Sequence, residues 1–158
     1  MENNYHLLQP LDNAIYTWAQ SILYKHGHTR ILTVLPEPNA EDWIGDLLAE
    51  TYDVSYTAID LLGGCAGYDA VVAAGLLQRL SGIASEKIIQ GLEKTVKCGG
   101  LVLITLSNQH YTDDKVLWIA EGKKIEASLK NNKDYEAHTI DVKGYNNMPS
   151  VYLVSYTV

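Results

Sequence analysis

The polar residues best suited to chemistry follow an apolar run in the second half of the chain. Residues 101–106 read LVLITL, and Ser107-Asn108-Gln109-His110-Tyr111 comes directly after them. An imidazole titrates near neutral pH, so His110 is a candidate general base. A loop of Ser, Asn, Gln and His is equally compatible with an ordinary surface connection. The sequence therefore offers His110 as a catalytic candidate beside a purely structural reading.

Two further polar residues follow other apolar runs. Gln78 comes shortly after the run at 70–74, and Asp60 directly follows the run at 54–59. If these runs are parallel strands, their carboxyl ends lie at one edge of the sheet, where such folds place ligands. Asp60 then stands where dinucleotide-type folds put an acid for ribose hydroxyls, or it is a turn former or helix cap. Gln78 is a second catalytic candidate at the same edge.

A strand, a helix and a second strand within residues 67–106 must position these side chains. The runs at 70–74 and 101–106 are unbroken and apolar, as in strands that are covered on both faces. Between them we expect a helix over 85–97 with Ser85 as its N-cap, and Cys98-Gly99-Gly100 ends it. Two such strands joined by a helix pair in parallel with a right-handed crossover. The apolar face of this helix consists of Ile88, Ile89, Leu92 and Val96.

Two motifs of this unit resemble the middle of the class I S-adenosylmethionine-dependent methyltransferases. Tyr68-Asp69 before an apolar run is similar to the family's Phe/Tyr-Asp motif. Lys97-Cys98-Gly99-Gly100 before LVLIT is similar to its Lys-Pro-Gly-Gly motif, with Cys in place of Pro. The resemblance covers residues 67–106 by motif and the rest by element order. It implies a Rossmann-like fold, and S-adenosylmethionine as the cofactor of an active member.

The remaining patterns complete an α/β fold. We expect parallel strands near 31–35, 54–59, 70–74 and 101–106, and then strands at 135–142 and 151–158. The eight residues between the last two strands are too few for a parallel crossover, so this pair must be antiparallel. The sequence thus predicts a Rossmann-like, mostly parallel sheet with helices on both faces and a C-terminal antiparallel hairpin, a trimmed methyltransferase fold. We expect one domain over 1–158, with an N-terminal helical segment at 1–28 that includes a helix at 10–25.

The spacing also indicates which part of the fold is trimmed. Only about ten residues separate the strand at 54–59 from Tyr68, too few for the helix and extra strand of a complete methyltransferase. Either the third strand is missing, or the first strand and its helix are missing. In the second case Asp60 matches a later, adenine-contacting Asp of the family.

The segment after the first strand departs from the resemblance. In a methyltransferase this strand runs into a Gly-rich turn that lets the backbone approach the cofactor. This chain has Pro36-Glu37-Pro38-Asn39 instead, and each proline removes a backbone donor. The resemblance puts Glu37, Asp60 and Gly75 at cofactor-binding positions.

These features predict a methyltransferase-like domain that lacks the Gly-rich cofactor loop, has no catalysis and acts through protein binding or dimerisation. No cofactor is then expected. The alternative is a working S-adenosylmethionine-dependent methyltransferase that acts on a small molecule through an atypical loop.

Composition narrows the expected partners and location. The net charge of −7 disfavours nucleic acid as a partner. The chain opens on MENNY without a basic and apolar leader, and no apolar run is long enough to cross a bilayer, so we expect a cytoplasmic protein with no membrane contact. Cys65 and Cys98 have no metal-ligand spacing, so we expect no metal.

Overall fold

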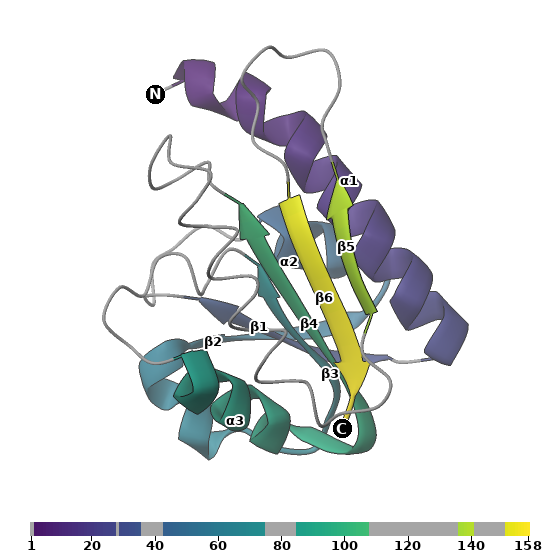
Figure 1. Cartoon of the computed structure of the whole chain (residues 1–158), viewed down its shortest axis with the longest axis vertical. Coiled ribbons are helices and arrows are strands. Elements are labelled where there is room, and N and C mark those ends of the chain that lie inside the picture. The colour runs from purple at the N-terminus through teal and green to yellow at the C-terminus, as the bar shows by residue number, and fades with distance from the viewer. Residues whose placement is uncertain (1, 28, 36–42, 75–84, 108–135, 141–150) are drawn as a thin grey trace.

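The computed structural model describes residues 2–27, 29–35, 43–74, 85–107, 136–140 and 151–158. In these residues one sheet has six strands in the order β2-β1-β3-β4-β6-β5, and Figure 1 shows their arrangement. The elements in chain order are α1 Glu2–His26, β1 Arg30–Leu35, α2 Trp43–Leu48, β2 Asp53–Ala58, the 3-10 helix η1 Ile59–Gly64, β3 Tyr68–Ala74, α3 Ser85–Thr95, β4 Val96–Ser107, β5 Glu136–Ile140 and β6 Val151–Thr157.

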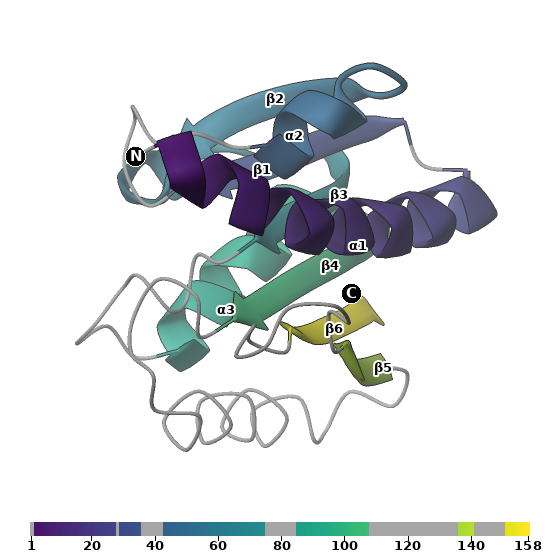
Figure 2. The same ribbon diagram turned by 90° about the horizontal axis from the view of Figure 1, so that it is seen from above.

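Strand directions in the sheet agree with the expectation from sequence. β2, β1, β3 and β4 are neighbours that all pair in parallel. β6 pairs antiparallel with both β4 and β5, so the closing pair is the predicted antiparallel hairpin. Figure 2 shows β2 and β5 at the two opposite edges of the sheet.

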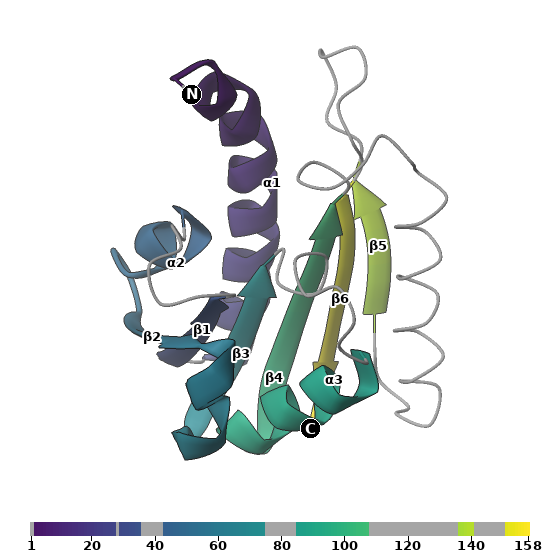
Figure 3. The same cartoon turned by 90° about the vertical axis from the view of Figure 1, so that its left-hand side faces the viewer.

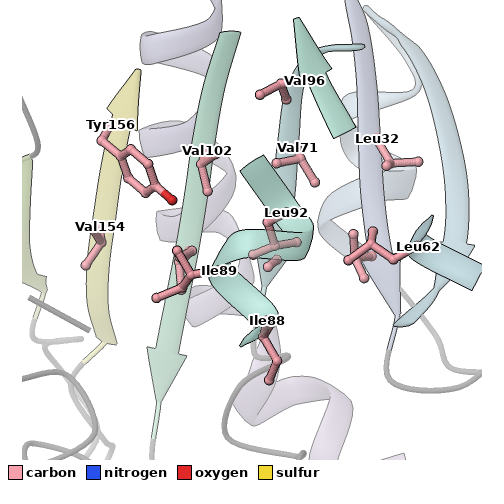
Figure 4. Packing of buried hydrophobic residues seen from close by; sticks show 13 residues of the cluster. Leu32, Leu62, Val71, Ile88, Ile89, Leu92, Val96, Val102, Val154 and Tyr156 are labelled. Atoms are coloured by element: carbon pink, nitrogen blue, oxygen red, sulfur yellow. The ribbon is translucent and has the colours of Figure 1, made fainter. Parts of the chain in front are cut away.

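Helices cover both faces of the sheet, as predicted. α1 and α2 pack on one face, and α3 and η1 pack on the other, which Figure 3 shows from the side. Successive residues of a strand point to opposite faces. Leu103 of β4 therefore joins the α1 and α2 side, whereas Val102 joins the α3 side. Figure 4 shows Ile88, Ile89 and Leu92 of α3 packed in the hydrophobic cluster on the α3 side of the sheet. This double covering explains why the strands read as unbroken apolar runs.

Two helix boundaries differ from the expectation. α1 begins at Glu2, earlier than the predicted residue 10, and ends before Gly27, whose φ of 67° and N–H bond to the carbonyl of Tyr24 form the C-cap. α3 ends at Thr95, not at residue 97. The Thr95 hydroxyl donates to the carbonyl of Leu92 at 2.6 Å, and Val96 already pairs with Tyr68 as a strand residue. An apolar, buried residue such as Val96 suits the end of a helix and the start of a strand equally, so its spacing in the sequence does not distinguish the two.

The Lys-Cys-Gly-Gly motif forms an irregularity at the start of β4. β4 advances from Val96 to Leu101 while β3 advances only from Tyr68 to Ala70, so extra residues of β4 bulge outward. A Cβ on Gly100 would lie 2.7 Å from the Cβ of Val96 and 3.0 Å from the carbonyl oxygen of Asp69. The position therefore excludes any side chain, which explains the glycine in physical terms.

The bulge brings a cation to Asp69. Lys97 Nζ lies 2.6 Å from Asp69 Oδ1. The other carboxylate oxygen accepts hydrogen bonds from the backbone N–H groups of Thr29 and Arg30, at 3.0 and 2.9 Å, and from the Thr29 hydroxyl. The Arg30 guanidinium also lies 5.0 Å from the centre of the Tyr68 ring. Asp69 thus joins the starts of β1, β3 and β4; we call this set of contacts the Asp69 clasp.

We expect Asp69→Asn to destabilise the fold by about 1.5–3 kcal/mol, because it weakens charge-assisted hydrogen bonds that a partly buried carboxylate accepts. The backbone N–H of Arg30, then Lys97 and Thr29, lower the pKa of Asp69. A lowered pKa means that the stabilisation is present above about pH 5 and is lost as the pH falls below about 4. Urea denaturation of the wild type and the variant from pH 7 to pH 3 checks both effects.

The matched control is Lys97→Ala. Lys97 is 56% exposed, so its loss should cost less than about 1 kcal/mol. Equal costs for the two variants would show that the ion pair, and not the backbone hydrogen bonds, carries the clasp.

A second prediction concerns the core. Leu103 is fully buried and pairs with Val72 in the middle of the sheet, so Leu103→Ala should cost roughly 2–5 kcal/mol of unfolding free energy. Leu61→Ala is the control, because Leu61 is 65% exposed and its truncation should change stability by less than about 0.5 kcal/mol. An unchanged denaturation midpoint for Leu103→Ala would contradict the central position of β4.

Candidate functional site

The sheet has a topological switch point between β1 and β3. From β1 the chain moves outward to β2, whereas from β3 it moves in the opposite direction to β4. In open parallel sheets the crevice outside the carboxyl ends at such a point is where ligands bind. The last described residues there are Leu35 of β1 and Ala74 of β3. Leu35 is buried and Ala74 is half-buried. These two strand ends therefore contribute apolar, uncharged side chains to the switch point.

Asp60 supplies an acid beside this switch point. Ala58, the last residue of β2, pairs with Leu35, the last residue of β1. η1 begins immediately afterwards, and Asp60 lies in its first turn with an exposed side chain. The carboxylate therefore lies near the end of β1, on a short helix that Leu62 anchors in the α3 cluster. Its placement suits an acceptor for the hydroxyl groups of a ligand at the carboxyl edge.

The other candidate residues lie outside the described residues. These are Glu37, Gly75, Gln78 and His110, so their proposed roles stay predictions from the sequence. Each belongs to a segment that follows the carboxyl end of β1, β3 or β4. Among the five candidates, Asp60 alone therefore has a described position.

The two groups whose pKa values are shifted most, Tyr156 and Asp69, have structural roles and lie away from the switch point. Tyr156 of β6 is 2% exposed, and its hydroxyl donates to Glu93 Oε1 of α3 at 2.8 Å. Burial first, and then Glu93, raises the pKa of Tyr156. The pair attaches α3 to the sheet on the face shown in Figure 4. Asp69 is similarly engaged in the clasp, at the amino ends of the strands.

Sequence reasoning missed the role of Asp69. The sequence places Asp69 in the first resemblance motif, before the predicted strand at 70–74, and Lys97 in the second motif, and no contact between them was predicted. The structure joins these motifs through one ion pair. The signal was that each motif precedes one of the two strands predicted to pair in parallel, so that both motifs lie at the amino ends of neighbouring strands. Spacing alone does not predict the bulge that makes the contact.

Neither a metal centre nor a membrane span emerges from the described ranges. Among these residues, no three His, Cys, Asp or Glu side chains come together as ligands for a metal ion. None of the described helices has both the length and the apolar character needed to cross a bilayer. Cys65, half-buried, and Cys98, exposed, are free thiols.

Comparison by sequence alone finds no relatives: no protein-family model and no curated protein matches this chain. Comparison by structure finds methyltransferases. Magnesium protoporphyrin IX methyltransferase (ChlM) from Synechocystis PCC 6803, solved with bound S-adenosylmethionine, aligns with a TM-score of 0.62 at 12% identity, over 94% of this chain and 79% of that one.

Two further structures agree. The N-methyltransferase NodS from Bradyrhizobium japonicum WM9, in complex with S-adenosylhomocysteine, gives a TM-score of 0.60 at 13% identity, over 90% of this chain and 84% of that one. Phosphoethanolamine N-methyltransferase 2 from Haemonchus contortus gives a TM-score of 0.58 at 12% identity over 94% of this chain. This chain spans only 38% of that larger protein.

At this level of identity the likeness concerns the fold. The parallel strands, the antiparallel closing pair and these structural neighbours agree with the resemblance seen in the two motifs. The chain has the Rossmann-like fold of the class I S-adenosylmethionine-dependent methyltransferases.

Proposed function

We propose that this chain is a non-catalytic, methyltransferase-like protein that acts by binding another protein. The proposal rests mainly on one observation, which is the sequence that follows β1 at the switch point. The buried end of β1 at Leu35 continues as Pro36-Glu37-Pro38 without a glycine.

Binding of a cofactor at this position depends on how closely the backbone can approach it. A cofactor cradle at this position needs amide donors that face the ligand and a backbone without bulky side chains. Pro36 and Pro38 have no N–H group and each carries a ring. A segment of this composition favours a closed or rebuilt edge over a site for S-adenosylmethionine.

The rival function is a working methyltransferase with an atypical loop, and the position of Asp60 favours it. An exposed carboxylate beside the end of β1 suits the hydroxyl groups of a ribose. ChlM and NodS were solved with S-adenosylmethionine and S-adenosylhomocysteine, respectively. If this chain binds the same ligands, Asp60 is the described residue that would contact them.

Isothermal titration calorimetry with S-adenosylmethionine and S-adenosylhomocysteine separates the two functions. We expect no saturable heat up to about 1 mM ligand. This result would mean that the dissociation constant is larger than about 1 mM. Asp60→Ala should then titrate like the wild type, because no bound ligand depends on its carboxylate.

Asp53→Ala is the matched control, since Asp53 is an exposed Asp at the opposite end of the same strand. Stoichiometric binding that Asp60→Ala abolishes and Asp53→Ala preserves would overturn the proposal and establish the cofactor site of the rival function.

A further inference from the structure

The negative charge of the chain is concentrated in one part of the sequence. Residues 31–78 contain eight Asp and Glu residues and no Lys, Arg or His. The chain as a whole has 19 acidic residues and 12 Lys and Arg, so the remaining residues carry nearly balanced charge. The acidic part contains α2, β2, η1, β3 and β1 from its second residue on. Arg30, the first residue of β1, lies just before it and pairs with Asp53. The half of the sheet that ends at β2 is therefore anionic, and the half that ends at β5 is not.

Exposed carboxylates of this part surround β2. Asp53 is its first residue, Asp60 lies in the first turn of η1 just beyond its last residue, and Glu50 lies in the turn that leads into it. Asp46 of α2 accepts a hydrogen bond from the Tyr56 hydroxyl at 2.8 Å. All four carboxylate side chains are exposed. They lie at both ends of the strand and on its α2 side, which gives the strand a negative rim.

In the described sheet β2 is also an edge strand. Among the described strands it pairs only with β1. Alternate residues of an edge strand direct their N–H and C=O groups away from the sheet, where they can pair with another chain. Natural edges often carry Lys, Pro or a bulge that prevents such pairing. β2 reads DVSYTA and has none of these. Val54 and Ser55 are half-buried, and Tyr56 is 43% exposed.

We propose that β2 binds an extended, Lys- or Arg-rich segment of a partner protein, which adds to the sheet as a further strand. The inference rests on the proposed function and names the kind of partner. Backbone hydrogen bonds to β2 supply the pairing, and the carboxylate rim selects basic side chains.

Charge argues against a second copy of this chain on the same edge. Two β2 strands that pair antiparallel bring two acidic rims together, and like charges at close range oppose association. A basic partner has the opposite effect, because it neutralises the carboxylates of Asp53 and Asp60 at the two ends of the strand.

Fluorescence anisotropy with a labelled octapeptide of alternating lysine and valine tests this inference. We expect saturable binding at low ionic strength that weakens in about 0.5 M salt. The same peptide with alternate backbone nitrogens methylated keeps its charge but cannot pair as a strand, so its affinity should fall at least about tenfold. A glutamate and valine peptide should not bind.

Protein variants locate the site. Asp53→Lys places a cation on the strand and should weaken the lysine peptide at least about tenfold. Glu136→Lys makes the same charge change at the opposite edge, on the exposed first residue of β5, and should weaken it by less than about threefold. Asp53→Asn is a milder variant for the case in which Asp53→Lys disturbs folding. Its loss of affinity for the lysine peptide should lie between the losses of the two lysine variants.

Three results with the peptides would overturn the inference. They are the absence of saturable binding, equal affinity for the methylated peptide, and equal loss in the two lysine variants, since the last two indicate diffuse attraction without strand pairing. A dimer of the chain alone that Asp53→Lys dissociates would also overturn it in favour of a second copy. S-adenosylhomocysteine binding in calorimetry would contradict the proposed function without changing any peptide result.

Discussion

The hydrogen bonds that Asp69 accepts are the constraint on which the rest of the sheet depends. One carboxylate holds the backbone N–H groups at the start of β1, belongs to β3 itself and pairs with Lys97 in the bulge of β4. The three central strands are therefore aligned at their amino ends, and their parallel registers carry this alignment to the carboxyl ends of β1 and β3. Because Gly100 lies against the backbone of Asp69, the two motifs that carried the resemblance are two halves of one contact. They determine architecture and contribute no group to the switch point.

Most of the fold was predictable because burial on both faces leaves a direct record in the sequence. The apolar runs of β3 and β4 and the short connection before β6 predicted the strands and their directions. The Asp69 clasp was not predictable, since Lys97 reaches Asp69 only through a bulge that local patterns do not encode. The end of α3 was ambiguous, because Val96 suits a helix face and a buried strand equally. Of the site, the sequence predicted Asp60 just beyond the end of a strand. His110 stands in a polar stretch without periodicity, and such a stretch does not determine where a side chain lies.

The trimmed edge connects the fold to the proposed function. In the described sheet β2 is the outermost strand, beside β1 at the switch point. A complete fold that loses either its first or its third strand keeps two strands on the outer side of β3. The observed strand order therefore fits both alternatives for the missing strand. Loss of an outer strand requires no new pairing inside the sheet and leaves β2 without an outer neighbour. β2 is therefore an edge in the described sheet, and the proposed loss of the cofactor site rests on the two prolines that follow Leu35 in the sequence.

The central claim is that a methyltransferase fold is retained here without its ligand. Backbone amide NMR spectra recorded with increasing S-adenosylhomocysteine test it most directly, because they report on each position at the switch point. The account predicts that the amide signals of Leu35, Asp60 and Ala74 keep their positions up to about 1 mM ligand. Saturable shifts that centre on these three residues, at the carboxyl ends of β1 and β3 and the start of η1, would contradict it.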